Sequence, residues 1–411
     1  MKMKKNNLLI LAVAALGFAA CANDETIAVN EKLAESNAIS FRTLVGGQMR
    51  AADVTTENLN AADGTFYATA IHKVDATTKT YFDNVPFVYT TGTFNSATKY
   101  YWPAAGTLDF FAYTPAVKAN ELARTDYKTF TVTPSTTVAE QLDLVFANTD
   151  GKTKNGVYNT TQHYGADGIP INFRHAQSKI VVKVKNSELS NLKFEITGMK
   201  IVNVDGSATF TYNDAAAPTG DENTDNTGTL KVGDWTNNAN DRTAVYTTAF
   251  SPNTVFAKQD DSQFLNGNGT IGTEDEHLNM ILIPQTTPDA TTEYSAATLN
   301  APYSGSYIAL KMVIKDNVND IVIANATTDV DTKNKWAMWP VKFEWEPGKK
   351  YTYVIDLAGG GYWELNDDTD SDLDPILDGA VIKFVSVTVD NWSPESESAV
   401  TFPVPAPAPA P

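Results

Sequence analysis

Residues 308–315 read IALKMVIK, in which apolar side chains alternate with other residues, two of them lysines. Successive side chains of a β-strand point to opposite faces of the sheet, so this pattern predicts a strand with one buried face and one wet face. Residues 180–185, IVVKVK, repeat the pattern. Helical periodicity is hard to find, and Asn, Asp, Gly, Pro and Thr separate most of the apolar runs. The sequence therefore predicts an all-β protein.

The number and spacing of the candidate strands indicate how the chain is divided. Many short strands separated by turn residues are typical of β-sandwiches, and 411 residues suffice for two of them. We expect two tandem β-sandwich domains of mainly antiparallel strands, transthyretin-like or Greek-key in type, over residues 37–173 and 174–393. An extended Pro- and Ala-rich tail, residues 394–411, follows. The candidate strands are residues 39–44, 66–73, 87–89, 108–113, 130–132, 142–146, 171–173, 180–184, 308–314, 341–345, 351–355 and 382–389.

Two local features predict further details of the C-terminal half of the chain. Residues 346–349, Glu-Pro-Gly-Lys, supply turn dihedrals between two of the candidate strands, which predicts a hairpin of residues 341–345 with residues 351–355. Residues 213–240 and 259–276 are long, acidic and rich in Asn and Gly, so we expect them to be surface insertions outside the core.

Composition excludes several classes of function. Asp and Glu number 49 against 31 Lys and Arg, which gives a formal charge of −18. A field of that sign repels phosphate backbones and argues against nucleic acid as a partner. One cysteine excludes a disulfide framework and a cysteine-based zinc site, and four scattered histidines offer little for acid–base chemistry. We therefore expect a protein that is not an enzyme, with no catalytic residues, no metal site and no cofactor.

The first residues indicate export. Three lysines followed by an apolar run are typical of a secretory signal peptide, which we expect over residues 1–20. The adjoining LGFAAC looks like a bacterial lipobox, with cleavage between Ala20 and Cys21 and acylation of Cys21, the only cysteine of the chain. Residues 21–36 would then be a lipidated tether held in outer-membrane lipid.

One acidic segment has the spacing of a calcium-binding loop. Asp368, Asp370 and two further aspartates recur at every second position, as the oxygen ligands of a calcium loop do. The sixth position of that loop is Leu373 where glycine is required, and the twelfth is Gly379 where a bidentate glutamate is required. An acidic solvated loop is the better interpretation, and adventitious calcium stays open.

An aromatic cluster precedes one candidate strand. Tyr100, Tyr101 and Trp102 are consecutive. Such a cluster can form a stacking platform for sugars, and in β-sandwiches it also packs against the core and its rim. The sequence leaves both interpretations open.

The segment from Ile39 to Arg50 carries a processing signal. Ile39, Phe41 and Leu44 belong to an apolar strand, and a loop with two glycines then leads to Arg50. An exposed arginine after a strand is a good substrate for a trypsin-like protease. Cutting there would separate the first strand from its domain and leave unpaired backbone and an apolar groove.

In order and spacing, a set of short motifs resembles the fimbrillin family, the Mfa-like pilin lipoproteins of type V pili in Bacteroidales-type bacteria. The resemblance extends over nearly all of the chain after the signal peptide. Its motifs are the lipobox Cys21, residues 39–41 with 50–51, residues 100–103 with 108–115, residues 173–175 before 179–184, residues 347–353, and residues 387–392.

The resemblance implies a fimbrial subunit. Members are exported as outer-membrane lipoproteins, cut by an arginine-specific or trypsin-like protease, and polymerised with other pilin subunits into a surface fimbria that serves adhesion to a host or bacterial surface ligand. The processing arginine maps best to Arg50, with Arg42 as the alternative. The strand of Ile39, Phe41 and Leu44 would leave, and a C-terminal strand of the next subunit would fill its groove.

The donor of that strand has two candidates. Proline cannot donate to a β-ladder, so the chain from Pro403 onward is a poor donor. The apolar side chains of the two candidate segments are Val381, Phe384, Val385, Val387 and Val389 in the first, and Val400 and Phe402 in the second. If neither is donated, a tip or accessory pilin is the alternative. A surface glycan-binding lipoprotein that uses Trp102 is a further alternative.

Overall fold

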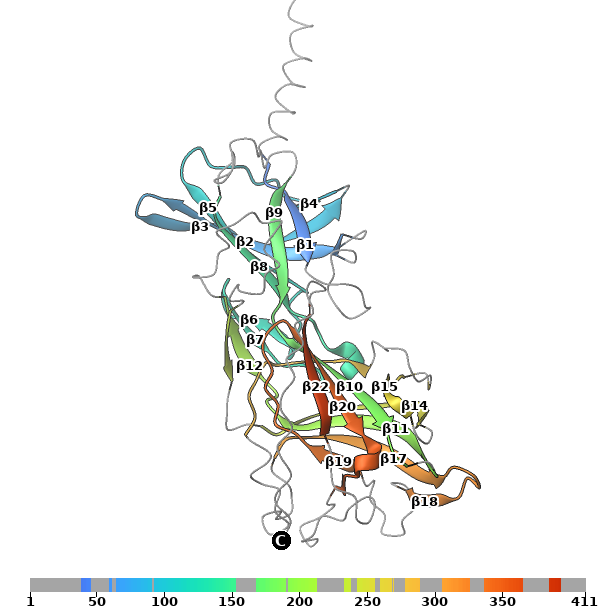
Figure 1. The fold of residues 1–411 in the computed structure, drawn as a ribbon. Coiled ribbons are helices and arrows are strands. Elements are labelled where there is room, and N and C mark those ends of the chain that lie inside the picture. Colours follow the sequence, from blue (N-terminus) through green and yellow to red (C-terminus); the bar gives the residue numbers. More distant parts are fainter. Residues whose placement is uncertain are drawn as a thin grey trace, which may run out of the picture.

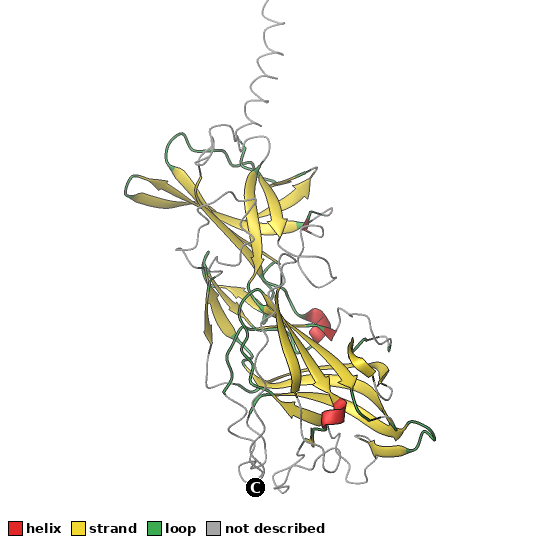
Figure 2. Cartoon of the chain, in the orientation of Figure 1, coloured by secondary structure: helices red, strands yellow, loops and turns green. Residues whose placement is uncertain are grey.

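The protein is described here by a computed structural model. It describes residues 38–45, 59–60, 64–90, 92–152, 168–189, 191–212, 233–237, 242–255, 259–267, 269, 278–288, 305–325, 336–364 and 384–392. Strands dominate these residues, as Figure 2 shows, and the helical segments include single 3-10 turns such as Val138–Glu140 and Leu357–Gly359. The expected all-β class is confirmed. Among the described residues, no helix has the length and apolar character needed to cross a membrane.

Seven strands from the first part of the chain form a closed ring at the top of Figure 1. Neighbouring strands in this ring are antiparallel except β1 and β9, which are parallel. Phenylalanines fill the interior, and Phe66, Phe87 and Phe94 are fully buried there. In ring order the strands are β1 (Phe41–Val45), β4 (Thr93–Asn95), β3 (Thr77–Thr90), β2 (Thr65–Val74), β5 (Thr107–Thr114), β8 (Val145–Lys152) and β9 (Ile169–His175).

A small four-stranded sheet lies between the two larger units in Figure 1. Its strands come from both sides of Phe173, where we expected the domain boundary. Phe130 and Phe210 face each other across its central pair and are fully buried in a separate aromatic cluster. The boundary at residue 173 stays a prediction, and this sheet joins the two halves that it would divide. In order, the strands are β13 (Asp234–Asn237), β12 (Ala208–Thr211), β7 (Thr129–Val132) and β6 (Leu122–Arg124).

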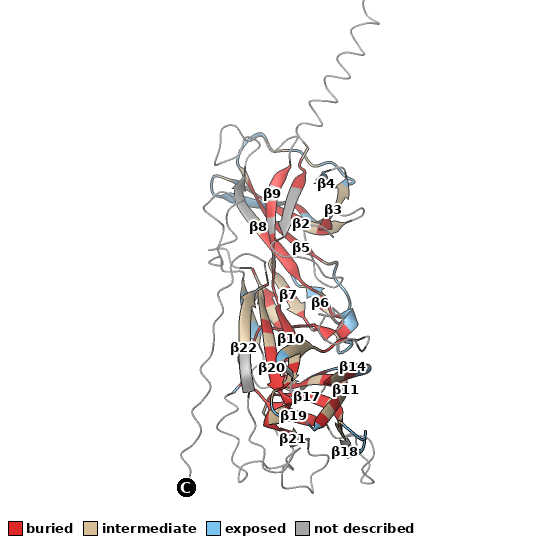
Figure 3. Ribbon diagram, turned by 45° about the vertical axis from the view of Figure 1, so that its right-hand side comes forward, coloured by how far each residue is buried: buried red, intermediate tan, exposed pale blue. Residues whose placement is uncertain are grey.

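The remaining strands form two sheets around one large core, and we call this unit the C-terminal sandwich. Figure 3 shows buried residues running along the strands of both sheets. The pairs are antiparallel apart from β10 with β20. One sheet contains β15 (Gln259–Phe264), β10 (Ser178–Asn186), β20 (Lys349–Asp356) and β22 (Phe384–Asn391), with β16 (Met280–Leu282) also on β10. The other contains β14 (Ala244–Val255), β11 (Leu192–Val204), β17 (Tyr307–Asp316), β19 (Ala337–Pro340) and β21 (Tyr362–Trp363), with β18 (Val322–Asn325) on β17.

The expected hairpin of residues 341–345 with 351–355 is wrong. Strand β20 uses its two edges for β10 and β22, so neither edge is free for residues 341–345. Those residues instead pair with residues 285–287, where the amide of Trp345 donates to the carbonyl of Gln285 at 2.8 Å. The alternation was informative about burial, since Val341, Phe343 and Trp345 are all buried, but it did not identify the partner.

The two expected surface insertions also contain strands. Residues 259–264 form β15, which is antiparallel to β10, and residues 234–237 form β13. A cross-strand contact helps to explain β15: the ammonium of Lys183 lies 4.4 Å from the ring centroid of Phe264, which is a cation–π distance. The acidic composition of residues 259–264 predicted a surface loop. The strand could not be predicted locally because its partner, β10, is distant in the sequence.

Candidate functional site

The first strand fills the centre of the phenylalanine core. Ile39 is 3% exposed, and Phe41 is fully buried. The ring of Phe41 meets three neighbours nearly edge to face, with centroids 4.8 Å from Phe87, 5.2 Å from Phe110 and 5.5 Å from Phe66. Edge-to-face contacts at these distances are favourable for aromatic rings. Phe41 is therefore enclosed within the core and is not a peripheral addition to it.

The backbone of the same strand closes the ring of strands. Strand β1 pairs in parallel with β9 from Phe41↔Ile169 to Val45↔Phe173, and Phe41 also pairs with Phe94 of β4. The amide of Ile169 donates to the carbonyl of Ser40 at 2.7 Å.

Strand β9 depends on β1 for most of its pairing. Its pairing with β8 involves only Arg174 and His175. Among the described residues, the stretch 169–173 therefore has β1 as its one strand partner. Removing β1 would uncover unpaired backbone on β9 and β4 and a groove lined by phenylalanines.

The two candidate processing arginines differ in their position. Arg42 lies within β1, opposite Pro170 of β9, and its side chain is outside the described residues. Leu44, also expected in the displaced strand, has its backbone opposite Asn172, and its side chain is likewise not described. Arg50 lies outside the described residues, as do Ala20, Cys21 and the expected signal peptide and tether.

The aromatic cluster of residues 100–102 lies directly beside β1. The carbonyl of Tyr100 accepts a hydrogen bond from the amide of Ile39 at 2.8 Å. Tyr100 and Trp102 pack against the phenylalanine core, and Tyr101 is 41% exposed. Two of the three expected platform residues thus turn inward and one turns outward. A sugar platform at this cluster stays a prediction.

The first donor candidate is an edge strand. Strand β22 pairs with β20 from Lys349↔Asn391 to Ile355↔Phe384, and in the described part of the chain its other edge has no strand partner. Val387 and Val389 are half-buried and pack against the large core. The backbones of Phe384 and Val385 lie in β22, but their side chains are outside the described residues, as are Val381, Val400 and Phe402.

A buried aromatic pair that the sequence motifs contain, but that we did not predict, fixes the end of β22. The indole of Trp392 stacks on the imidazole of His175 with centroids 4.1 Å apart. Nδ1 of His175 lies 3.0 Å from both carboxylate oxygens of Asp143, and the ammonium of Lys179 lies 5.9 Å from the Trp392 ring. His175 and Trp392 belong to the sequence motifs at residues 173–175 and 387–392, but spacing alone did not show that these two motifs meet.

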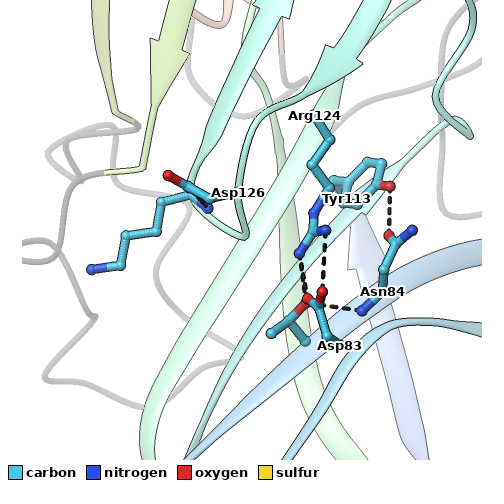
Figure 4. A network of polar contacts seen from close by, with 7 residues as sticks. Asp83, Asn84, Tyr113, Arg124 and Asp126 are labelled. Atoms are coloured by element: carbon cyan, nitrogen blue, oxygen red, sulfur yellow. Dashed lines mark hydrogen bonds and ion pairs between the residues drawn. The ribbon is translucent and has the colours of Figure 1, made fainter. Parts of the chain in front are cut away.

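A polar network links the small sheet to the ring of strands, and Figure 4 shows its members. The guanidinium of Arg124 on β6 forms an ion pair with Asp83 on β3 and donates to the hydroxyl of Thr69 at 3.2 Å. The hydroxyl of Tyr113 donates to Oδ1 of Asn84 at 2.7 Å. Partial burial alone would raise the pKa of the Asp83 carboxyl, but hydrogen bonds from Arg124 and Thr69 outweigh it and hold that pKa below 3.8.

The structure offers little that could hold a metal. In the described ranges, His, Cys, Asp and Glu side chains do not gather in groups of three or more that could bind an ion. The acidic run from Asp368 to Asp374 lies outside those ranges, so its calcium hypothesis stays a prediction.

Comparison with known proteins assigns the chain to a family. The sequence model described as fimbrillin-like matches residues 50–392. The chain belongs to the fimbrillin-like family. This fimbrillin-like chain resembles the crystal structure of a fimbrial protein from Bacteroides vulgatus, with a TM-score of 0.51 and 16% identity over 86% of this chain and 99% of that one. A fimbrial assembly protein from Parabacteroides distasonis is 9% identical over 89% of this chain and 100% of that one, with a TM-score of 0.35. None of the curated proteins compared with the chain matches it.

Proposed function

We propose that the chain is a structural subunit of a cell-surface fimbria that assembles by donor-strand exchange and has no enzymatic role. It would be exported as a lipoprotein acylated at Cys21, cut after Arg50, and joined head to tail with other pilin subunits. Family membership supports the subunit role. The observation that carries the exchange mechanism is the placement of β1, because one short N-terminal strand supplies both a fully buried core side chain, Phe41, and most of the pairing of β9.

The energetics explain why a vacated groove would capture another strand. Burial of Ile39 and Phe41 is worth roughly 1.5 to 3 kcal/mol for each side chain. Loss of β1 forfeits that burial and leaves backbone groups of residues 169–173 without their ladder. A donor strand that restores both is strongly favoured, and the resulting joint would be long-lived.

The placement of Arg42 favours Arg50 as the processing site. Proteases bind their substrates in extended form with the backbone unpaired, and Arg42 lies inside a paired strand. Arg50 lies five positions after the end of β1 in the sequence and so outside that paired strand. The family match begins at residue 50, five residues beyond the end of β1.

The second donor candidate is similar in sequence to the strand that would be displaced. Residues 39–41 read Ile-Ser-Phe and residues 400–402 read Val-Thr-Phe, so a β-branched residue, a hydroxyl residue and a phenylalanine recur at the same spacing. In a strand, the first and third side chains of such a triplet face the same side. Phe402 could therefore occupy the position of Phe41 in a neighbouring subunit, with Val400 in that of Ile39.

Strand β22 is the costlier donor. Trp392 holds its end by stacking on His175, and its withdrawal would open the large C-terminal core that Val387 and Val389 help to cover. Residues 400–402 lie beyond the Trp392 anchor in sequence. We therefore propose residues 400–402 as the donor and keep β22 as the alternative.

Proteolysis of the soluble form that begins after Cys21 tests this function. Trypsin should make an early cut after Arg50, found by mass spectrometry, and electron microscopy should then show filaments. Arg50→Gln should block both events, whereas Arg42→Gln, the matched control, should leave them intact. A clean cut without assembly would identify a tip or accessory subunit, and resistance at Arg50 would argue against strand exchange.

A further inference from the structure

A polar cleft lies where the small sheet meets the C-terminal sandwich, and it shares no residue with the groove of β1. Its volume is about 390 Å3. Trp235 of β13 and Trp345 contribute aromatic surface, while Asp205, just after β11, and Arg242, just before β14, contribute charge. Clefts of this size that combine apolar walls with a few placed polar groups are typical of small-ligand sites.

Two buried polar atoms beside this cleft form an ion pair with each other but lack a hydrogen-bond partner among the described residues. Asp205 is only 2% exposed, and its Oδ2 accepts a hydrogen bond from Nδ2 of Asn237 at 2.9 Å. Its Oδ1 lies 3.7 Å from Nε of Arg242, which is beyond hydrogen-bond distance. Both of these atoms are buried, and neither has a hydrogen-bond partner among the described residues. Such groups are costly unless something satisfies them.

The pair has the donor and acceptor pattern that a hydroxyl group matches. The carboxylate oxygen can only accept, and the guanidinium nitrogen can only donate. If the Arg242 side chain shifts away from Asp205, a hydroxyl that enters between the two atoms can donate to Asp205 and accept from Arg242 at the same time; the shift is needed because both atoms are buried and only 3.7 Å apart. Arg242 is held toward this position because its Nη2 donates to the carbonyl of Thr286 at 3.1 Å.

The two tryptophans offer carbon surface instead of hydrogen bonds. Nε1 of Trp235 donates to the carbonyl of Ala176 at 2.8 Å, and Nε1 of Trp345 donates to the hydroxyl of Tyr353 at 2.9 Å. Both indole N–H groups are therefore satisfied by the protein. Trp345 is only 3% exposed, so the accessible ring surface comes from the half-buried Trp235, and such a surface stacks well on the C–H face of a pyranose.

The negative charge around the cleft favours an uncharged ligand. Asp234 and Glu346 also line the cleft, so three carboxylates face one guanidinium. The whole chain carries −18. Sialic and uronic acids would be repelled by this field, whereas an uncharged sugar would not.

We propose that this cleft binds a neutral pyranose unit of a glycan, with a hydroxyl bridging Asp205 and Arg242 and a ring face packed on Trp235. The site would give the chain an adhesive capacity of its own. It requires neither cleavage nor polymerisation, so it can be tested on the uncut monomer and stands or falls separately from strand exchange.

A glycan microarray that carries neutral and sialylated glycans tests the proposal, with the soluble uncut chain as probe. Saturation-transfer NMR with methyl mannoside, methyl galactoside and methyl N-acetylglucosaminide provides a second readout for weak binding. We expect binding to neutral glycans only. Arg242→Gln and Trp235→Leu should each weaken it roughly tenfold or more, while thermal unfolding shows that the variants are folded.

The matched control is Tyr101→Ala, which removes the exposed member of the other aromatic cluster. It should leave binding unchanged. The proposal is overturned if neither method detects a neutral sugar, if only acidic glycans bind, or if folded Arg242→Gln and Trp235→Leu bind as the unmodified chain does. Loss of binding in Tyr101→Ala alone would also overturn it, because the sugar would then occupy the cluster beside β1.

Discussion

The imidazole of His175 and the indole of Trp392 lie face to face, 4.1 Å apart and only 8° from parallel. His175 ends β9, the strand that β1 completes, and Trp392 directly follows β22, the last described strand. Asp143 holds the imidazole at its edge, where both carboxylate oxygens lie 3.0 Å from Nδ1. One buried contact thus couples the strand at the proposed exchange groove to the end of the C-terminal sandwich.

Loss of the Trp392 indole should destabilise this junction. Trp392 is 7% exposed, so Trp392→Ala leaves a cavity beside His175 and should lower the free energy of unfolding by about 3 to 5 kcal/mol. Urea denaturation followed by circular dichroism measures the change. Tyr101→Ala, at an exposed position, is the control and should shift the free energy of unfolding by no more than about 0.5 kcal/mol. Equal shifts in the two variants would contradict a structural role for the stacked pair.

Truncation of Phe41 should loosen the first strand before it affects the rest of the chain. Phe41→Ala removes a fully buried ring from between Phe66, Phe87 and Phe110, a change that typically costs about 3 to 5 kcal/mol. Hydrogen exchange should then speed up first in the amides of residues 169–173, because β1 is their strand partner in the described structure.

Phe41→Leu provides the graded comparison for that experiment. It keeps much of the apolar volume and should show a smaller increase in exchange. Strand β20 pairs with both β10 and β22 and should keep its protection in both variants. Uniform acceleration across β20 and residues 169–173 would mean that β1 does not open locally.

Period-two alternation was sufficient to predict strands wherever one face of the strand is core. Residues 308–314 fall within β17, and residues 180–184 fall within β10, because in both strands the apolar side chains face the same large core. Ile39 and Phe41 were predicted as strand residues for the same reason, and their burial follows the alternation.

Partners distant in sequence could not be predicted from that alternation. Residues 341–345 look like half of a hairpin, yet their partners at residues 285–287 lie more than fifty positions away. Asp205 and Arg242 meet only because β11 ends and β14 begins at the same corner of the sandwich. Nothing in the local sequence at either position indicates this contact, and the cleft was therefore found only in the structure.

Acid should weaken the link between the small sheet and the ring of strands. The pKa of Asp83 is lower in the folded chain than its ordinary value of 3.8, so the ion pair stabilises the fold above that value and is lost as the pH falls through the folded pKa. Because the Asp83 side chain is about half exposed, the contribution is modest, about 1 kcal/mol or less.

Arg124→Gln tests this link when the free energy of unfolding is measured from pH 6 down to the acid transition. The variant should be less stable at pH 6 and should lose less stability below pH 3.8 than the unmodified chain. Lys342→Gln breaks the pair with Glu344, which is exposed on both sides, and is the matched control, for which we expect an unchanged acid profile. If the free energy of unfolding of Arg124→Gln falls with pH as that of the unmodified chain does, the Asp83 ion pair does not contribute to the acid sensitivity.

Alkali should act on the same region through Tyr113. Burial raises the pKa of the Tyr113 phenol to about 12 from its ordinary value of 10. The folded chain therefore holds this proton more tightly than the unfolded chain, so its contribution to stability is complete below pH 10 and is lost as the pH rises to 12. Tyr351, whose pKa burial also raises to about 12, should contribute independently because it lies in the other core.

Tyr113→Phe separates this effect from the hydrogen bond that the same hydroxyl makes. The variant loses the contact with Asn84 and should be about 1 kcal/mol less stable at neutral pH. Between pH 10 and 12 its free energy of unfolding should fall less steeply than that of the unmodified chain, and Tyr113→Phe combined with Tyr351→Phe should flatten the profile further. If Tyr113→Phe keeps the original slope, Tyr113 does not contribute, and the alkaline loss of stability comes from the other tyrosines whose pKa burial raises, which are Tyr212, Tyr246, Tyr351 and Tyr353.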